Sequence, residues 1–160
     1  MYPMALVGLL FSVVLFGDGR VIRTATIPAS GQFTWTLQPR DRTVFSAAVD
    51  GVRTANVEVR VRRAVSIGIR QPVKGVYVFS GTIDRPEAGV QVTVARLDSE
   101  TRRVTGVAST RTTADGRYEI STSLPVGFAG YYALTSATAQ VDAGRSRLYG
   151  LIVNTRPGQA

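Results

Sequence analysis

The chain of 160 residues contains no cysteine and no histidine, and these two absences exclude much of enzyme chemistry. Without cysteine the chain has no disulfide and no thiolate nucleophile. Without histidine it lacks the usual general base near neutral pH, the commonest zinc ligand and the usual partner of a catalytic serine. We therefore predict a protein that is not an enzyme, with no catalytic residue, no metal and no cofactor.

Carboxylates remain as candidates for catalysis or cation binding. The closest pairs in the sequence are Asp84 with Glu87 and Asp98 with Glu100, and both pairs lie in polar turns. A glycosidase needs two carboxyl groups across a sugar cleft, and calcium prefers several oxygen ligands in one loop. Acids in turns usually cap and solubilise the turn, and no Asp-x-Asp run is present, so we favour neither a hydrolase nor a calcium site.

Helical periodicity is also absent, and the pattern that replaces it is typical of β-structure. Turn signals recur roughly every eight to twelve residues, as in sandwiches and barrels. The clearest is Asp115-Gly116, between two alternating segments in the stretch 110–120, where glycine supplies the positive φ that a hairpin turn requires. The fold class that this pattern predicts is all-β, built from tandem immunoglobulin-like β-sandwich modules.

Alternation of apolar and polar residues locates the strands. In the segment 33–37, Phe33, Trp35 and Leu37 share one face, which predicts a half-buried strand with the only tryptophan in the core and not exposed for sugar stacking. A second hairpin turn is predicted at Asp50-Gly51. The other predicted strands cover residues 24–27, 44–49, 57–62, 65–69, 76–83, 90–94, 104–112, 117–120, 131–136 and 147–153.

The most apolar stretch is residues 5–16, which has two interpretations. A membrane-spanning helix needs about 20 apolar residues, and a signal peptide needs a basic start, whereas nothing basic precedes Arg20. We favour a buried strand or strand pair, with a signal or anchor segment as the alternative.

A partial internal repeat indicates two modules. Gly31–Trp35 aligns with Gly116–Ile120, and the flanking segments keep the same order, which predicts a partial immunoglobulin-like module at 1–62, a complete sandwich at 63–156 and a tail at 157–160. The first module lacks counterparts of the opening strands at 65–83, so we expect an open sheet edge covered by another chain or a neighbouring domain. Alternatively, residues 1–62 form a smaller sheet packed on the second module.

The net charge is +8, and every basic residue except Lys74 is an arginine. Such a surface is either simply solvated or suited to polyanions. Aromatic residues do not interleave with the basic ones, so nucleic acid is not an expected partner. A sugar-binding patch of Phe128, Tyr131 and Tyr149 is a second candidate, although core packing is favoured for these rings. The candidate polyanion site comprises Arg60, Arg62, Arg63, Arg70 and Lys74.

Two motifs carry a family resemblance. The stretch 114–120 resembles the Asp-x-Gly-x-Tyr-x-Phe turn of bacterial carboxypeptidase-regulatory-like and Cna-B-like modules. The stretch 130–134 is similar to the Gly-x-Tyr-x-Cys corner of immunoglobulin-type strands, with leucine in place of cysteine. The only lysine lies in a Pro/Gly loop, so the isopeptide crosslink of some Cna-B modules is not expected. The resemblance assigns structural turn and corner roles to Asp115, Gly116, Tyr118, Gly130 and Tyr132.

These features predict a non-catalytic structural, spacer or adhesion module of a larger extracellular or cell-surface bacterial protein. The resemblance and the arginine-rich texture imply secreted or surface proteins of actinobacteria. The alternative is a module that binds acidic polymers or glycans through the arginine cluster or the tyrosine patch. The expected partners are neighbouring domains, another chain at the open edge, and a cell-wall polymer or glycan. Membrane anchoring through the N-terminal apolar stretch stays open.

Overall fold

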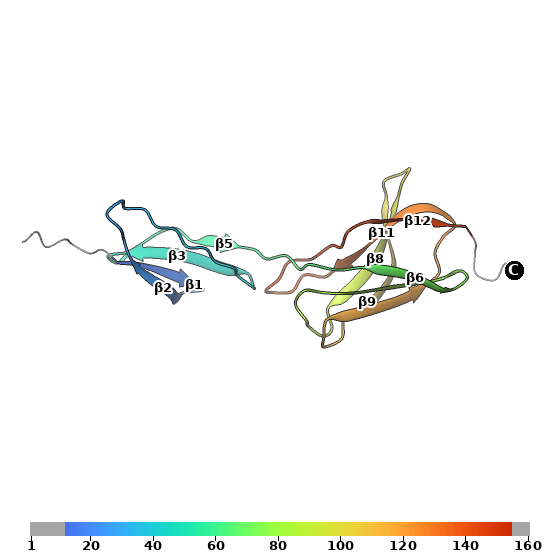
Figure 1. Ribbon diagram of the computed structural model, residues 1–160, viewed down its shortest axis with the longest axis horizontal. Helices are drawn as coiled ribbons and strands as arrows, with labels where there is room; N and C mark the ends of the chain where they lie inside the picture. The colour runs from blue at the N-terminus through green and yellow to red at the C-terminus, as the bar shows by residue number, and fades with distance from the viewer. Residues whose placement is uncertain (1–11, 155–160) are drawn as a thin grey trace, which may run out of the picture. The chain divides into compact units, whose positions relative to one another are not determined.

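The computed structural model describes residues 12–154, and every regular element in that range is a β-strand (Figure 1). The all-β fold class is therefore confirmed. The chain divides into two compact units, Met1–Val61 (unit 1) and Arg62–Ala160 (unit 2). A search of residues 12–154 finds no helix with the length and hydropathy needed to span a membrane.

Unit 1 contains one antiparallel sheet. Its strand order is β2-β1-β3-β4, and β5 also pairs with β3. The strands are β1 (Ser12–Gly17), β2 (Arg20–Thr26), β3 (Thr43–Val49), β4 (Val52–Arg53) and β5 (Val57–Val59). The turns Asp18-Gly19 and Asp50-Gly51 have positive φ at both residues, as two-residue hairpin turns require. The turn predicted at Asp50-Gly51 is thus confirmed.

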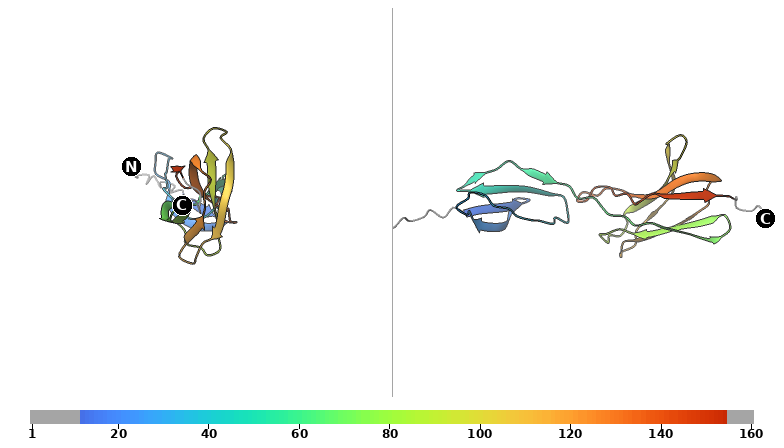
Figure 2. Two further views of the ribbon diagram at one scale, coloured as in Figure 1. Left: turned by 90° about the vertical axis from the view of Figure 1, so that its right-hand side faces the viewer. Right: turned by 45° about the horizontal axis from the view of Figure 1, so that its top comes forward.

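Unit 2 is a sandwich of two antiparallel sheets, with orders β10-β7-β6 and β12-β11-β8-β9. In the right-hand view of Figure 2, β12 and the green β6–β7 hairpin lie in opposite layers. The strands are β6 (Gly68–Val73), β7 (Val76–Thr82), β8 (Gln91–Asp98), β9 (Val104–Arg111), β10 (Arg117–Thr122), β11 (Gly127–Thr135) and β12 (Tyr149–Val153).

The core of unit 2 lies between these sheets and follows from period-two alternation. Tyr77 and Phe79 of β7 are 6% and 0% exposed, and they face Val92 and Val94 of β8, which are both 0% exposed. The rings of Phe79 and Tyr131 are 5.8 Å apart between centroids. Alternate residues of each strand thus fill the space between the sheets, which stabilises both layers.

The turn at Asp115-Gly116 forms, but the hairpin predicted around it is wrong. The strands that it joins belong to different sheets, because β9 pairs with β8 and β10 pairs with β7. Gly116 has a φ of +74°, and its N–H donates to the Thr113 carbonyl at 2.9 Å. A Cβ at Gly116 would lie 2.9 Å from the Cα of Pro86, so glycine is needed for a close approach as well as for the turn. Turn chemistry predicts the bend, whereas burial of the strands selects their partners.

The strand predicted at 33–37 is also wrong. Residues 32–39 form no strand, and the side chain of Phe33 is 40% exposed. Trp35 and Leu37 are half-buried, and the rings of Phe33 and Trp35 contact each other with centroids 5.0 Å apart. Alternation is present here, but no strand described in unit 1 hydrogen-bonds to this segment. A strand needs such a neighbour for its backbone N–H and C=O groups.

The apolar N-terminal stretch begins the sheet of unit 1. Residues 12–16 belong to β1, where Val13 is 0% and Leu15 is 8% exposed, so the strand prediction is confirmed for them. Residues 5–11 lie outside the described range. At the other end of unit 1, β5 is shorter than the strand predicted at 57–62, and Val57 is 61% exposed.

The sheet of unit 1 has the same strand order as the larger sheet of unit 2. The order β2-β1-β3-β5 corresponds to β9-β8-β11-β12. The first strand pair of each sheet carries a register shift at the same place, between Leu15 and Phe16 in unit 1 and between Val94 and Ala95 in unit 2. Such irregularities are specific features of a sheet, so this agreement supports the internal repeat.

The register of the last strand pair fixes the alignment of the repeat. Phe45 of β3 is opposite Val57 of β5, as Tyr131 of β11 is opposite Tyr149 of β12. Phe45 therefore corresponds to Tyr131 and not to the neighbouring Tyr132. A shift of one residue matters, because it exchanges the two faces of a strand.

Candidate functional site

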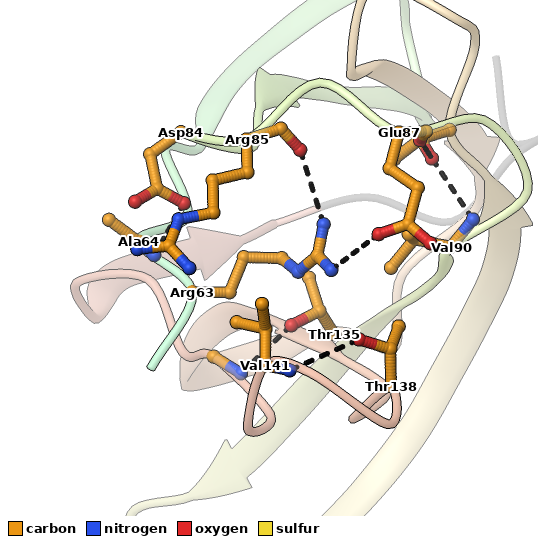
Figure 3. A network of polar contacts seen from close by, with 11 residues as sticks. Arg63, Ala64, Asp84, Arg85, Glu87, Val90, Thr135, Thr138 and Val141 are labelled. Atoms are coloured by element: carbon orange, nitrogen blue, oxygen red, sulfur yellow. Dashed lines mark hydrogen bonds and ion pairs between the residues drawn. The ribbon is translucent and has the colours of Figure 1, made fainter. Parts of the chain in front are cut away.

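A cluster of polar contacts is built around Arg63 in unit 2 (Figure 3). Its side chain is 0% exposed, and its Nη2 lies 2.8 Å from Oε2 of Glu87. Its Nη1 donates to the Arg85 carbonyl at 3.2 Å. Glu87 is half-exposed, so the ion pair has one buried and one solvated partner. A buried guanidinium must be paired, which makes Glu87 a structural residue.

Two further contacts hold the chain around Arg63. The Asp84 carboxylate accepts a hydrogen bond from the Ala64 N–H at 3.0 Å, and the Asp84 N–H donates to the Ala64 carbonyl at 3.1 Å. A Cβ at Gly144 would lie 2.1 Å from the Arg63 carbonyl oxygen. The first acidic pair considered for catalysis, Asp84 with Glu87, therefore closes a turn against residues 63–64.

Threonine hydroxyls satisfy the neighbouring backbone groups. The hydroxyl of Thr112 donates to the Glu87 carbonyl and accepts from the Val90 N–H at 3.1 Å. Thr135 and Thr138 accept from the N–H groups of Gly144 and Val141 in the same way, at 2.8 and 3.2 Å. These hydroxyls hydrogen-bond to backbone groups of the loops, and this role is structural.

The second acidic pair also serves a turn. One oxygen of Asp98 accepts from the N–H groups of Glu100 and Thr101, at 3.1 and 2.9 Å, and from the Thr101 hydroxyl at 3.0 Å. These hydrogen bonds, with Arg96 nearby, lower the pKa of the Asp98 carboxyl. A carboxylate held ionised by its own loop is suited to capping and not to acid catalysis. Among residues 12–154 no group of three or more acidic side chains has metal-site geometry.

The candidate polyanion residues differ in burial and in their ion pairs. Arg60 lies in unit 1 and pairs with Glu58 at 3.0 Å. Arg63 is buried, so its side chain cannot belong to a binding surface. Arg70 pairs with Glu119 at 3.2 Å, with both side chains more than half exposed. Exposed residues of the set in unit 2 are Arg62, Arg70 and Lys74.

The tyrosine patch does not form as a surface. Tyr131 is 0% exposed in the core, and Tyr149, opposite it on β12, packs against that core. Phe128 points to the other face and is 56% exposed, opposite Ile152 at 63%. Core packing, the favoured interpretation, holds for the tyrosines. Phe128 and Ile152 form an apolar outer pair that the sequence analysis did not identify.

The turn and corner residues include the tyrosine that ties unit 2 together. The hydroxyl of Tyr118 donates to the Ser66 carbonyl at 2.6 Å across the smaller sheet, and burial raises the pKa of this phenol. Gly81 permits this contact, because a Cβ there would lie 2.2 Å from the Ser66 oxygen. Tyr132 is 7% exposed and lies on the opposite face of β11 from Tyr131, with the Arg145 guanidinium 5.4 Å from its ring centroid.

Comparisons with known proteins find no related sequence but include a likeness to a solved structure. No family model matches the chain, and no curated protein matches it. A solved structure of a "tetra-tandem repeat in extending region of large adhesion protein" aligns over 88% of this chain and 42% of that chain, with 19% identity and a TM-score of 0.42. The chain thus spans less than half the length of that structure. The carboxypeptidase-regulatory-like and Cna-B-like resemblance stays a prediction.

Proposed function

We propose that the chain is a non-catalytic structural segment, a spacer or adhesion module, of a larger extracellular or cell-surface bacterial protein. The observation that carries the proposal is the repetition of one sheet order, β2-β1-β3-β5 and β9-β8-β11-β12, along a single chain. Tandem β-modules add length by repetition, and each repeat forms its own hydrogen-bonded sheet.

The use of polar residues supports the same role. Asp84, Glu87 and Asp98 hold backbone groups or a buried arginine in their own turns. Polar groups committed in this way stabilise a fold without offering proton transfer or a free nucleophile to a substrate. A module of this kind works by holding its ends apart and by presenting its loops.

Single-molecule stretching of the full chain between two handles tests the mechanical role. We expect a discrete unfolding event for unit 2, followed by release of about 3.5 Å of contour length per unfolded residue. Glu87→Gln, which removes the counter-charge of buried Arg63, should lower the unfolding force. Glu119→Gln, which changes an exposed ion pair, is the matched control. Smooth extension with no discrete event would contradict the proposal.

Binding of acidic polymers or glycans is the second candidate, and the net charge of +8 favours it. Salt-dependent retention on a sulfated polysaccharide resin tests this function. Replacing Arg62, Arg70 and Lys74 by serine should abolish retention. Replacing Arg20, Arg23 and Arg40 by serine leaves the same net charge of +5 (8 minus 3) and should not. Equal loss in both triple variants would mean non-specific attraction, and no retention of the unmodified chain at low salt would end this candidate.

A further inference from the structure

The segment Gln32–Leu37 of unit 1 corresponds to β10 of unit 2. The number of residues between the end of β2 and Gln32 equals the number between the end of β9 and the start of β10. Each begins at a turn of the same geometry: the Gly31 N–H donates to the Pro28 carbonyl at 2.9 Å, as the Gly116 N–H does to the Thr113 carbonyl. The two glycines have φ angles of +72° and +74°. The repeat therefore extends through this turn.

The corresponding segments differ in what lies beside them. In unit 2, β10 pairs with β7, with Tyr118 opposite Gly81 and Ile120 opposite Phe79. Tyr118 and Ile120 are 4% and 5% exposed as a result. No such neighbour is described in unit 1, where the counterpart of Tyr118 is Phe33, with 40% of its surface exposed. The segment 33–37 thus has the alternation of a strand but forms none, because it has no partner in the described residues 12–61.

A hollow marks the place of that partner. It measures about 440 Å³ and is lined by Ile22, Leu37 and Phe45, among others. Phe45 corresponds to Tyr131. In unit 2 the ring of Phe79 on β7 packs against the ring of Tyr131, with 5.8 Å between their centroids. The space beside Phe45 therefore lies where the side chain of a strand like β7 would pack. Apolar surface of this kind is buried in the complete unit of the same chain.

We infer that unit 1 is a strand acceptor: Gln32–Leu37 pairs antiparallel with one strand of a β-hairpin that has the chemistry of β6–β7. The hairpin would present large apolar side chains at alternate positions to the face of the unit 1 sheet that carries Leu15 and Phe45. It would place a glycine opposite Phe33, as Gly81 lies opposite Tyr118. Main-chain hydrogen bonds supply affinity in such strand addition, and the alternate side chains supply specificity.

The β6–β7 hairpin of a folded second copy cannot be this partner, because its Tyr77 and Phe79 are already buried in unit 2. The occupant is therefore a polypeptide hairpin of the same pattern from outside the two described units. This inference goes beyond the proposed mechanical role, and its readout is separate from mechanical resistance.

Trp35 makes the test direct, because it is the only tryptophan of the chain and lies within the acceptor segment. The full chain is titrated with a synthetic peptide of residues 66–83, which contains no tryptophan, while Trp35 emission is recorded selectively. We expect a saturable blue shift and loss of access to a soluble quencher as the ring is covered. A second sample carries the same peptide fused ahead of Met1 through a flexible Gly/Ser linker, which raises its effective concentration.

Two matched variants locate the site. Phe33→Asp places a charge where the hairpin would bury a ring, and it should weaken binding by roughly tenfold or more. Thr34→Asp changes the adjacent position, whose counterpart in β10 is already an acid, Glu119, and should leave binding unchanged. A Phe79→Asp peptide should fail to bind. The inference is wrong if neither the free peptide nor the fusion alters Trp35 emission, or if Phe33→Asp binds as the unmodified chain does.

Discussion

Thr54 of unit 1 and Ser146 of unit 2 make the same set of hydrogen bonds. The Thr54 hydroxyl accepts from the Ala47 N–H at 3.0 Å, and the Thr54 N–H donates to the Ala47 carbonyl at 2.8 Å. Ser146 does the same with Ala133, at 2.9 Å in both bonds. Each hydroxyl also donates to the carbonyl of the next residue. The two units therefore share these three hydrogen bonds, although the residue that makes them is a threonine in one unit and a serine in the other.

An exchange of side chains between neighbouring strands accompanies this equivalence. In unit 1 the aromatic residue is Phe16 on β1, opposite Ser46 of β3. In unit 2 the aromatic residue is Tyr132 on β11, opposite Ala95 of β8. The arginine that follows the equivalent turn stacks on the ring in both units: Arg53 lies 4.1 Å from the ring centroid of Phe16, as Arg145 covers Tyr132. In each unit, one aromatic ring occupies this position on the strand pair. It comes from β1 in unit 1 and from β11, the counterpart of β3, in unit 2.

The exchange predicts that unit 2 can carry its aromatic ring on β8 in place of β11, as unit 1 carries Phe16 on β1. Tyr132→Ser alone should cost about 3 kcal/mol of unfolding free energy, because it empties a covered site. Ala95→Phe alone should cost about 1 to 3 kcal/mol through overpacking. In the double variant the new ring occupies the vacated space, so the cost should fall short of the sum by about 1 to 3 kcal/mol. Denaturant unfolding followed by circular dichroism measures the cycle, and simple additivity would contradict the equivalence.

The buried guanidinium of Arg63 gives a second prediction. Glu87→Gln removes its counter-charge and should lower the unfolding free energy of unit 2 by about 2 to 4 kcal/mol, less than for a fully buried partner because Glu87 is half-exposed. Glu119→Gln makes the same chemical change beside Arg70, where both side chains are solvated, and should cost at most about 1 kcal/mol. Equal costs for the two variants, measured by urea unfolding, would show that Arg63 does not depend on Glu87.

The contrast between Arg63 and Phe79 shows how far sequence reasoning reaches in this chain. The position of Phe79 in the core follows from alternation within its own strand, and alternation is a local pattern. Arg63 looks like one member of a basic surface, because its partner Glu87 lies 24 residues further along and only the fold brings them together. Phe33 and Trp35 alternate as a strand does, yet no strand described in unit 1 pairs with them. Local periodicity predicts faces, whereas pairing depends on contacts distant in sequence.

The close approach at Gly81 gives a third prediction. Gly81→Ala would put a Cβ 2.2 Å from the Ser66 carbonyl oxygen and disturb the hydrogen bond from Tyr118, so we expect a loss of about 3 kcal/mol. Gly68→Ala in β6 is the matched control, because its Cβ would meet nothing closer than 3.6 Å, and its effect should stay within about 1 kcal/mol. The midpoint temperatures of thermal unfolding of both variants measure the difference. Equal midpoints for Gly81→Ala and Gly68→Ala would mean that the backbone at Ser66 moves away to admit the new Cβ.

Two buried phenols predict how unit 2 responds to alkaline pH. Burial raises the pKa of Tyr118 and of Tyr131 above the ordinary tyrosine value of about 10. A group whose pKa is raised by folding contributes stability that is complete below the unfolded pKa and lost as the pH rises toward the folded pKa. The unfolding free energy should therefore be level below about pH 9 and fall above about pH 10, by about 1.4 kcal/mol per pH unit for each tyrosine.

The ultraviolet absorbance of tyrosinate measures this ionisation directly. In the native chain Tyr118 and Tyr131 should ionise at a higher pH than they do in denaturant, because burial raises the pKa of both phenols. Tyr118→Phe should remove one of the two delayed ionisations and reduce the slope of stability against pH by about half. Identical titration curves for the native and denatured chain would mean that both hydroxyls reach water. In that case the Tyr118 to Ser66 hydrogen bond would not close the smaller sheet in solution.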